Sequence, residues 1–139
     1  MPIPTEPIGS IPRPAALIDG MHDLAAGRIS PERWRSLCDQ AVRDTIRRFE
    51  ATGSPVITDG EQTKPSFATY PIHGLTNLAS DGVVIPFADG HVRQLPRLTA
   101  GPFRYQTYAS LYLEAAKRHA HAPVKQAVIS ASALSLLYP

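Results

Sequence analysis

A long amphipathic helix that leads directly into a β-branched run sets the strongest limit on how this chain folds. Ser30 is a favourable N-cap, Pro31 suits the first helical turn, and Gly53 suits the position just after the helix. Apolar residues recur between them in steps of three and four: Trp34, Leu37, Cys38, Ala41, Val42, Thr45, Ile46 and Phe49. The run Pro55–Glu61 follows at once, and such a run directly after a helix indicates a buried parallel strand.

Other segments extend this alternation of helix and strand. Residues 1–14 are rich in proline and suit a short strand that runs into a loop, and residues 14–26 have helical spacing. Residues 107–120 predict a further helix, with these side chains directed inward: Tyr108, Leu111, Tyr112 and Ala115. Residues 123–130 then read as a buried strand entered from a proline. The pattern predicts an α/β fold with a parallel sheet.

A long excursion separates the second predicted strand from the last helix. Residues 62–101 are loop-like, and excursions of this length are usually functional. Within them, residues 83–87 and 91–95 flank the turn Asp89-Gly90 and are predicted to pair as a hairpin.

Composition excludes several classes of protein. A chain of 139 residues is at most one domain, and its net charge of +2 comes from basic residues interspersed with acidic ones, which is unlike a nucleic-acid-binding surface. The single cysteine, Cys38, excludes an intrachain disulfide. No signal peptide is evident, and no apolar stretch reaches the roughly 18–20 residues that span a bilayer. We therefore expect a soluble cytoplasmic protein with neither nucleic acid nor membrane as a partner.

Two acids and one glycine-containing turn are the best candidates for a site. Asp59 and Glu61 would lie at the carboxyl end of a strand, where alternation allows only one of them to face the centre of the fold. That carboxylate either holds a substrate ammonium group or acts as a base. Spacing is equally compatible with one acid capping a loop and the other being solvated. Gly9-Ser10 presents backbone N–H groups to an anion, or forms a plain turn.

Histidine and cysteine give weaker signals. His119 and His121 form an H-x-H pair of the kind seen in metal sites, but they fall at a helix end, where histidine also suits the helix dipole. Cys38 lies inside the apolar stripe and is expected to be a structural core residue rather than a nucleophile.

Three stretches together resemble a known family. They are IGSIPRP at residues 8–14, SPVITDGE at residues 54–61 and PVKQ at residues 123–126. In their order and spacing they are similar to the catalytic, zinc-carrying barrel of cobalamin-independent methionine synthases, and most of all to its short single-barrel bacterial relatives. The resemblance runs across nearly the whole chain and covers only the N-terminal portion of that barrel.

This resemblance implies a (β/α)8 TIM barrel. Residues 1–139 would be a single partial domain, with the hairpin-containing excursion placed after the second strand. The family transfers a methyl group from N5 of methyltetrahydrofolate to the sulfur of homocysteine, and zinc binds that sulfur and favours its thiolate form. We therefore expect an S-methyltransferase of the 5-methyltetrahydropteroyltriglutamate–homocysteine type, active in methionine biosynthesis.

The resemblance also implies particular substrate contacts. Ile8, Gly9 and Ser10 would line the pocket for the amino-acid end of homocysteine, and Glu61 would hold its ammonium group. No residue of this chain is implied as catalytic or as a zinc ligand, because the family's zinc ligands and proton-donating histidine lie on later strands. We therefore expect no zinc site here, and we expect the isolated chain to be inactive.

Two alternatives remain open. The family's tryptophan against the folate would align near Leu136, which favours a zinc-dependent thiol alkyltransferase with a non-folate donor. The other alternative is a non-catalytic remnant or interaction module. Because the chain ends soon after its last predicted strand, we expect a truncated opening piece of a larger catalytic domain. Such a half-barrel would self-associate through exposed strand edges.

Overall fold

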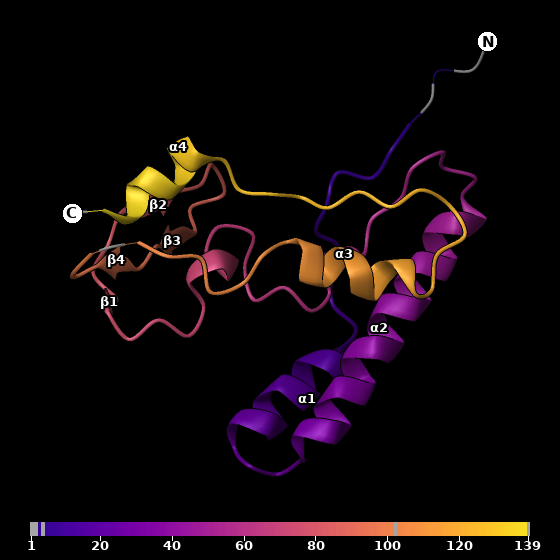
Figure 1. Ribbon diagram of the computed structural model, residues 1–139, viewed down its shortest axis with the longest axis horizontal. Coiled ribbons are helices and arrows are strands. Elements are labelled where there is room, and N and C mark those ends of the chain that lie inside the picture. Colours follow the sequence, from indigo (N-terminus) through magenta and orange to yellow (C-terminus); the bar gives the residue numbers. More distant parts are fainter. Residues whose placement is uncertain (1–2, 4, 102, 139) are drawn as a thin grey trace. The chain divides into compact units, whose positions relative to one another are not determined.

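The computed structural model describes residue 3, residues 5–101 and residues 103–138. The chain divides into two compact units, and each is built from two separate stretches of sequence. The first unit comprises residues 1–64 and 109–127, and the second comprises residues 65–108 and 128–139. Their α-helices and β-strands are labelled in Figure 1.

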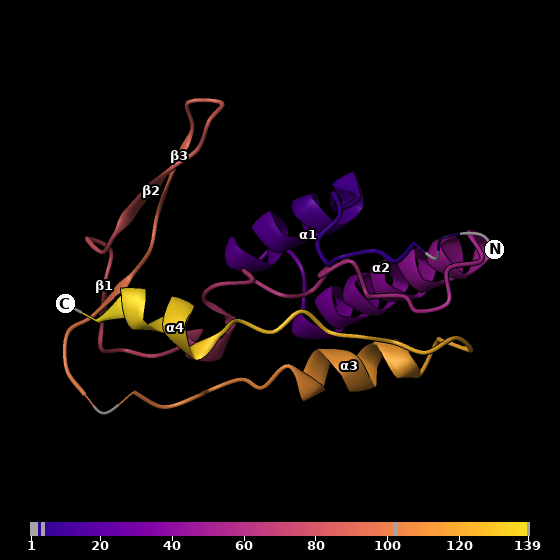
Figure 2. The same ribbon diagram turned by 90° about the horizontal axis from the view of Figure 1, so that it is seen from above.

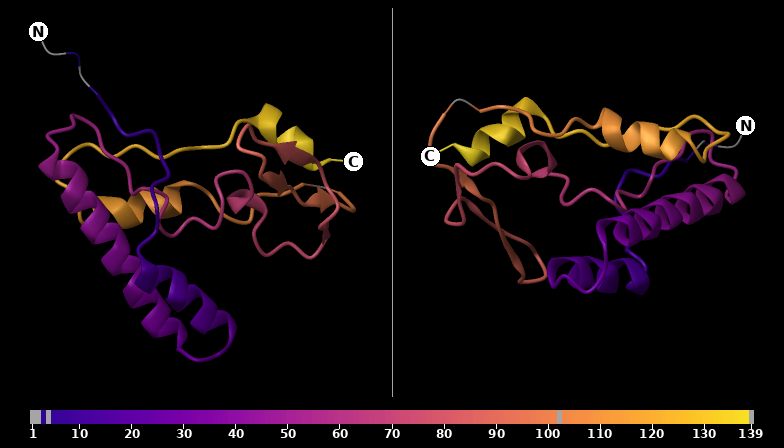
Figure 3. Two further views of the ribbon diagram at one scale, coloured as in Figure 1. Left: turned by 180° about the vertical axis from the view of Figure 1, so that it is seen from behind. Right: turned by 60° about the horizontal axis from the view of Figure 1, so that its bottom comes forward.

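Three α-helices lie in the first unit: α1 at Ala15–Ala25, α2 at Pro31–Ala51 and α3 at Ser110–Lys117 (Figure 1). The predicted boundaries of α2 are confirmed. The Ser30 hydroxyl accepts a hydrogen bond from the Arg33 backbone N–H at 3.2 Å, and Gly53 adopts a left-handed φ of 72° just after the helix. The helix expected over residues 14–26 is confirmed as α1. Both views in Figure 3 show α1 and α2 as a helical hairpin.

The core of the first unit lies where α2 and α3 meet the chain around Ile57. Its fully buried members are Val42, Ile46, Ile57 and Ala116. Phe49 and Val124 pack against this cluster. The apolar stripe predicted on α2 therefore faces the core through its central residues.

The predicted inward face of the third helix is partly wrong. Tyr112 is buried as expected, but Tyr108 and Leu111 are 63% and 64% exposed. The helix begins only at Ser110, so Tyr108 lies before its first turn, outside the helical register assumed for it. Ala116, one residue beyond the expected Ala115, is the alanine that enters the core.

The expected parallel strands are reduced to one contact. Ile57 and Val124 form a single parallel bridge, in which Ile57 N–H donates to the Pro123 carbonyl and Lys125 N–H donates to Ile57, both at 2.9 Å. The described residues of segment 1–14 form no strand, and prolines, which lack an N–H to donate, are frequent there. The prediction of a buried strand over residues 123–130 is wrong beyond the bridge, since Val128 is 57% exposed.

The second unit contains short antiparallel strands. They are β1 (Leu78–Ala79), β2 (Val84–Pro86), β3 (Val92–Gln94) and β4 (Arg97–Leu98). β2 pairs with β3 as the predicted hairpin, seen side by side in Figure 2, while β1 pairs with β4. Gly90 takes a φ of 88° in the hairpin turn.

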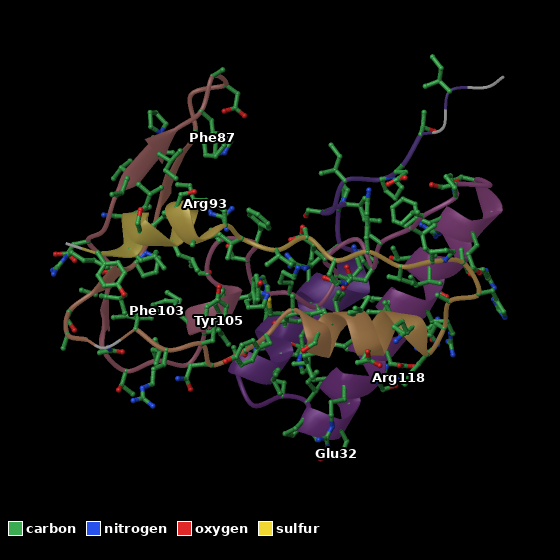
Figure 4. The ribbon with its side chains drawn as sticks, turned by 45° about the horizontal axis from the view of Figure 1, so that its top comes forward. Glu32, Phe87, Arg93, Phe103, Tyr105 and Arg118 are labelled. Atoms are coloured by element: carbon green, nitrogen blue, oxygen red, sulfur yellow. The ribbon has the colours of Figure 1, made fainter. Side chains whose placement is uncertain are left out.

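Short helices and aromatic contacts complete the second unit. The helices are η1 (Tyr70–Ile72), α4 (Ala131–Leu134) and η2 (Ser135–Leu137). Phe103 and Tyr105 lie next to each other in Figure 4, with ring centroids 5.5 Å apart in an edge-to-face arrangement. Among the described residues, no helix is long and apolar enough to cross a membrane.

Candidate functional site

A tight turn after Ile57 builds the candidate site. Gly60 and Glu61 both adopt left-handed backbone conformations, with φ values of 64° and 53°. The Thr58 hydroxyl accepts a hydrogen bond from Gly60 N–H, and Asp59 Oδ1 accepts one from Glu61 N–H, each at 3.0 Å. The expectation that Asp59 and Glu61 alternate along a strand is therefore wrong, because the chain leaves the extended conformation at Gly60. Instead, the short side chains of Thr58 and Asp59 hold the turn that orients Glu61.

The N-terminal segment is fixed onto this turn. Arg13 Nε donates to the Gln62 carbonyl at 2.8 Å, and its Nη2 donates to the carbonyls of Glu61 and Lys64. Ile11 N–H donates to the Gly60 carbonyl at 3.1 Å. One guanidinium group thus binds three backbone carbonyls of this segment, of which that of Glu61 also accepts from Lys64 N–H. Arg13 carried no role in the sequence analysis beyond its place in the IGSIPRP stretch.

The structure brings two of the four expected substrate residues into contact. Gly9 is buried, and a Cβ atom added to it would lie 2.5 Å from Oε1 of Glu61. Glu61 is itself only 7% exposed. Ile8 and Ser10 flank Gly9 but have exposed side chains, with Ile8 91% exposed. The glycine is therefore needed for close approach, since any side chain at residue 9 would displace the carboxylate.

The charges around Glu61 act in opposite directions. Burial raises the pKa of the Glu61 carboxyl, the positive charge of Lys64 opposes that shift, the Asp59 carboxylate adds to it, and Arg13 opposes it. The hydrogen bonds of Glu61 involve its backbone: its N–H donates to Asp59 Oδ1, and its carbonyl accepts from Arg13 Nη2. A largely buried carboxylate favours a ligand that brings both hydrogen-bond donors and a positive charge, and an ammonium group is such a ligand.

Further buried polar atoms surround this carboxylate. Asp59 is 1% exposed, and its Oδ2 atom has no hydrogen-bond partner among the described residues. Lys64 is fully buried, and its ammonium donates to the Ala127 carbonyl at 2.8 Å and to Gln126 Oε1 at 3.1 Å. Sequence reasoning missed Lys64 and Gln126. Their spacing in the sequence gives no indication that two polar residues 62 positions apart meet in the interior.

Metal ligands do not gather in the part of the chain that the structure describes. Residues 3, 5–101 and 103–138 contain no group of three or more His, Cys, Asp or Glu side chains that could hold a metal ion. His119 Nε2 lies 2.8 Å from Asp39 Oδ1, and His121 Nδ1 lies 3.4 Å from Glu50 Oε2. Each histidine thus has a different carboxylate partner. Zinc needs four ligands in one shell, so these residues do not fit it.

Cys38 is half-buried on α2 rather than fully enclosed. Burial raises the pKa of its thiol to about 11, against a smaller opposing effect of the Arg13 charge. A thiol with so high a pKa is a poor nucleophile at neutral pH. The raised pKa agrees with the expectation that Cys38 is not a nucleophile, but its half-buried position only partly matches the expected core placement.

Comparison with known proteins supports the resemblance read from the sequence. No model of a known protein family matches the chain. A 5-methyltetrahydropteroyltriglutamate–homocysteine methyltransferase of Syntrophotalea carbinolica is 32% identical over 68 residues, which cover 49% of this chain and 9% of that protein. A methionine synthase of Sulfurisphaera tokodaii is 30% identical over 92 residues, 66% of this chain and 27% of that protein.

A solved structure gives the same indication for the fold. The B12-independent methionine synthase of Shewanella sp. W3-18-1, determined in complex with selenomethionine, superposes with a TM-score of 0.69 at 17% identity. The match covers 97% of this chain and 40% of that one. The resemblance to cobalamin-independent methionine synthases is thus confirmed. The chain spans well under half the length of each of these proteins.

Proposed function

Because the chain resembles cobalamin-independent methionine synthases, we propose that its first unit forms part of the binding site for a homocysteine-like thiol in a methyl transfer of that type. One observation carries the proposal. Glu61 is only 7% exposed, and a Cβ atom on Gly9 would lie 2.5 Å from its Oε1 atom, so the carboxylate lies against the Gly9 backbone. An α-ammonium group would supply hydrogen-bond donors and a further positive charge to this carboxylate. Residues 1–139 would then correspond to the N-terminal portion of the barrel.

The other expected contacts fit this orientation of the substrate. Ile8 and Ser10 are the exposed neighbours of Gly9 in the chain, and the proposal assigns to them contacts with the same end of the substrate. Backbone N–H groups of this segment suit the substrate carboxylate. In the family, zinc favours the thiolate and methyltetrahydrofolate is the methyl donor. The proposal assigns to the described residues only the amino-acid end of the substrate, in a cytoplasmic enzyme of methionine biosynthesis.

A second candidate concerns the methyl donor. Leu136, which aligns near the family's folate-stacking tryptophan, is 43% exposed and has no aromatic ring. This residue therefore offers no stacking surface to a pterin. A thiol alkyltransferase with a non-folate donor would use the same amino-acid site and would differ only in what binds near Leu136.

Ligand titration of the ¹⁵N-labelled chain by NMR tests the amino-acid site. We expect L-methionine and L-homocysteine to perturb residues 8–10 and 58–64. N-acetyl-methionine, which lacks the ammonium group, should bind at least about tenfold more weakly, corresponding to about 1.4 kcal/mol. Glu61→Gln should remove the difference between the two ligands. Equal binding of methionine and its N-acetyl derivative to the unaltered chain would refute the proposal.

A further inference from the structure

Lys64 links two distant stretches of the first unit. Its side chain is fully buried, and its ammonium lies 2.8 Å from the Ala127 carbonyl, 3.1 Å from Gln126 Oε1 and 5.3 Å from the centroid of the Tyr112 ring. A buried ammonium group is costly unless its donors are satisfied. These acceptors and the aromatic face therefore fix its position.

The stretch that Lys64 holds forms one wall of the candidate site. A Cβ atom on Gly9 would meet the Ala127 side chain at 3.4 Å as well as Oε1 of Glu61 at 2.5 Å. Gly9 is thus enclosed by Glu61 and by Ala127, the residue whose carbonyl Lys64 binds. On the other side, Lys64 N–H donates to the Glu61 carbonyl at 3.3 Å. One lysine therefore connects the residue that carries the carboxylate with the wall opposite it.

The charges facing Lys64 match this geometry. Burial lowers the pKa of the Lys64 ammonium, while the carboxylates of Glu61 and Asp59 oppose the shift. The lysine charge in turn lowers the pKa of Glu61, as does that of Arg13 to a smaller extent, whereas Asp59 raises it. Lys64 is therefore the stronger of the two cations that oppose the effect of burial on the Glu61 carboxyl.

We propose that Lys64 is a positioning residue of the amino-acid site, which holds the 126–127 wall in place and keeps the Glu61 carboxylate ready for an ammonium group. The second part of this proposal, that Lys64 prepares Glu61 for an ammonium group, rests on the proposed function. Lys64 acts through Glu61 and Ala127 and need not touch the substrate. Substitution should therefore alter how binding depends on pH, which loss of packing alone would not do.

Two variants and one matched control test this role. The Glu61 side-chain ¹³C signal, followed by NMR against pH without ligand, should titrate at a higher midpoint in Lys64→Met than in the unaltered chain. Lys64→Arg retains the positive charge, so the Glu61 midpoint in this variant should lie close to that of the unaltered chain. Lys125→Met is the control, since Lys125 lies beside Gln126 but pairs at the surface with Glu6. An unchanged Glu61 midpoint in Lys64→Met would overturn the proposal.

Binding gives an independent readout. At neutral pH, Lys64→Met should weaken methionine binding at least about tenfold, and Lys125→Met should change it less than about twofold. If the unaltered chain does not bind methionine, the proposed function fails while the titration still decides the electrostatic role of Lys64. Should Lys64→Met not fold, the reciprocal measurement in Glu61→Gln applies. The Lys64 ¹⁵Nζ midpoint should fall there, and an unchanged midpoint would refute the coupling.

Discussion

Gly9 and Glu61 lie so close that the absence of a side chain at residue 9 determines where the carboxylate sits. A Cβ atom on Gly9 would stand 2.5 Å from Oε1 of Glu61, well inside van der Waals contact. The other close neighbour, the Ala127 side chain, would be at an ordinary 3.4 Å. The conflict thus falls on the movable end of one flexible side chain.

Gly9→Ala should consequently weaken methionine binding while leaving the free energy of unfolding nearly unchanged. Because the Glu61 carboxylate can swing away, the free energy of unfolding should change by less than about 1 kcal/mol. Methionine binding should weaken at least about tenfold, since the displaced carboxylate no longer meets the ammonium group. Gly101→Ala is the control, because a Cβ there has nothing within 4 Å. Urea unfolding and NMR titration measure both quantities, and unaltered binding in Gly9→Ala would contradict the expectation.

The raised pKa of Glu61 predicts a pH-dependent stability. The folded chain holds a proton on this carboxyl more tightly than the unfolded chain does. The stability it contributes is present below the unfolded pKa, near 4.5, and is lost as the pH rises through the folded value. Glu61→Gln should therefore gain stability relative to the unaltered chain as the pH is raised from about 4.5 to 7. Urea unfolding at both pH values tests this, and a difference that shrinks with pH would refute it.

The left-handed backbone of Glu61 makes glycine and alanine unequal replacements there. A non-glycine residue in this conformation costs roughly 1–2 kcal/mol, which glycine avoids, although glycine loses about 0.5–1 kcal/mol in chain entropy. Glu61→Gly should therefore be more stable than Glu61→Ala by up to about 1 kcal/mol, while both lose methionine binding. Thermal unfolding of the two proteins checks the order. Greater stability of the alanine variant would show that the turn carries no strain at residue 61.

The thiol of Cys38 should react slowly in the folded chain. With a pKa of about 11 instead of the ordinary 9.0, the thiolate fraction near pH 8 falls about a hundredfold. Iodoacetamide should therefore alkylate the native chain roughly a hundred times more slowly than the chain in concentrated urea. Mass spectrometry follows both reactions. Comparable rates would mean that Cys38 is not shielded.

Local signals in the sequence predicted local structure well. Helix α2 was readable because Ser30, Pro31 and Gly53 each act on the backbone within one turn of themselves. The β2–β3 hairpin was readable for the same reason, from Asp89-Gly90. Both depend on residues close to one another in the chain.

Non-local structure was less accessible. The pairing of Ile57 with Val124 continues for only one bridge, because the chain turns at Gly60 where spacing alone suggested a longer strand. Resemblance named Gly9 and Glu61, and the structure places them together. Lys64 was missed because its importance comes from partners 62 and 63 residues away. No periodicity or turn signal encodes such a contact.

The hydrogen bonds from Lys64 to Gln126 and Ala127 also set the order in which the hairpin and the first unit can fold as the chain is synthesised. The β2–β3 hairpin can form as soon as residue 94 has left the ribosome, since both of its strands are then available. The first unit cannot close until Ala127 emerges, because its wall and its buried lysine depend on that residue. Helix α3 is complete at Lys117, but until residue 127 emerges the Lys64 ammonium lacks the acceptors at Gln126 and Ala127. Nascent chains stalled before residue 127 should therefore depend most on chaperones.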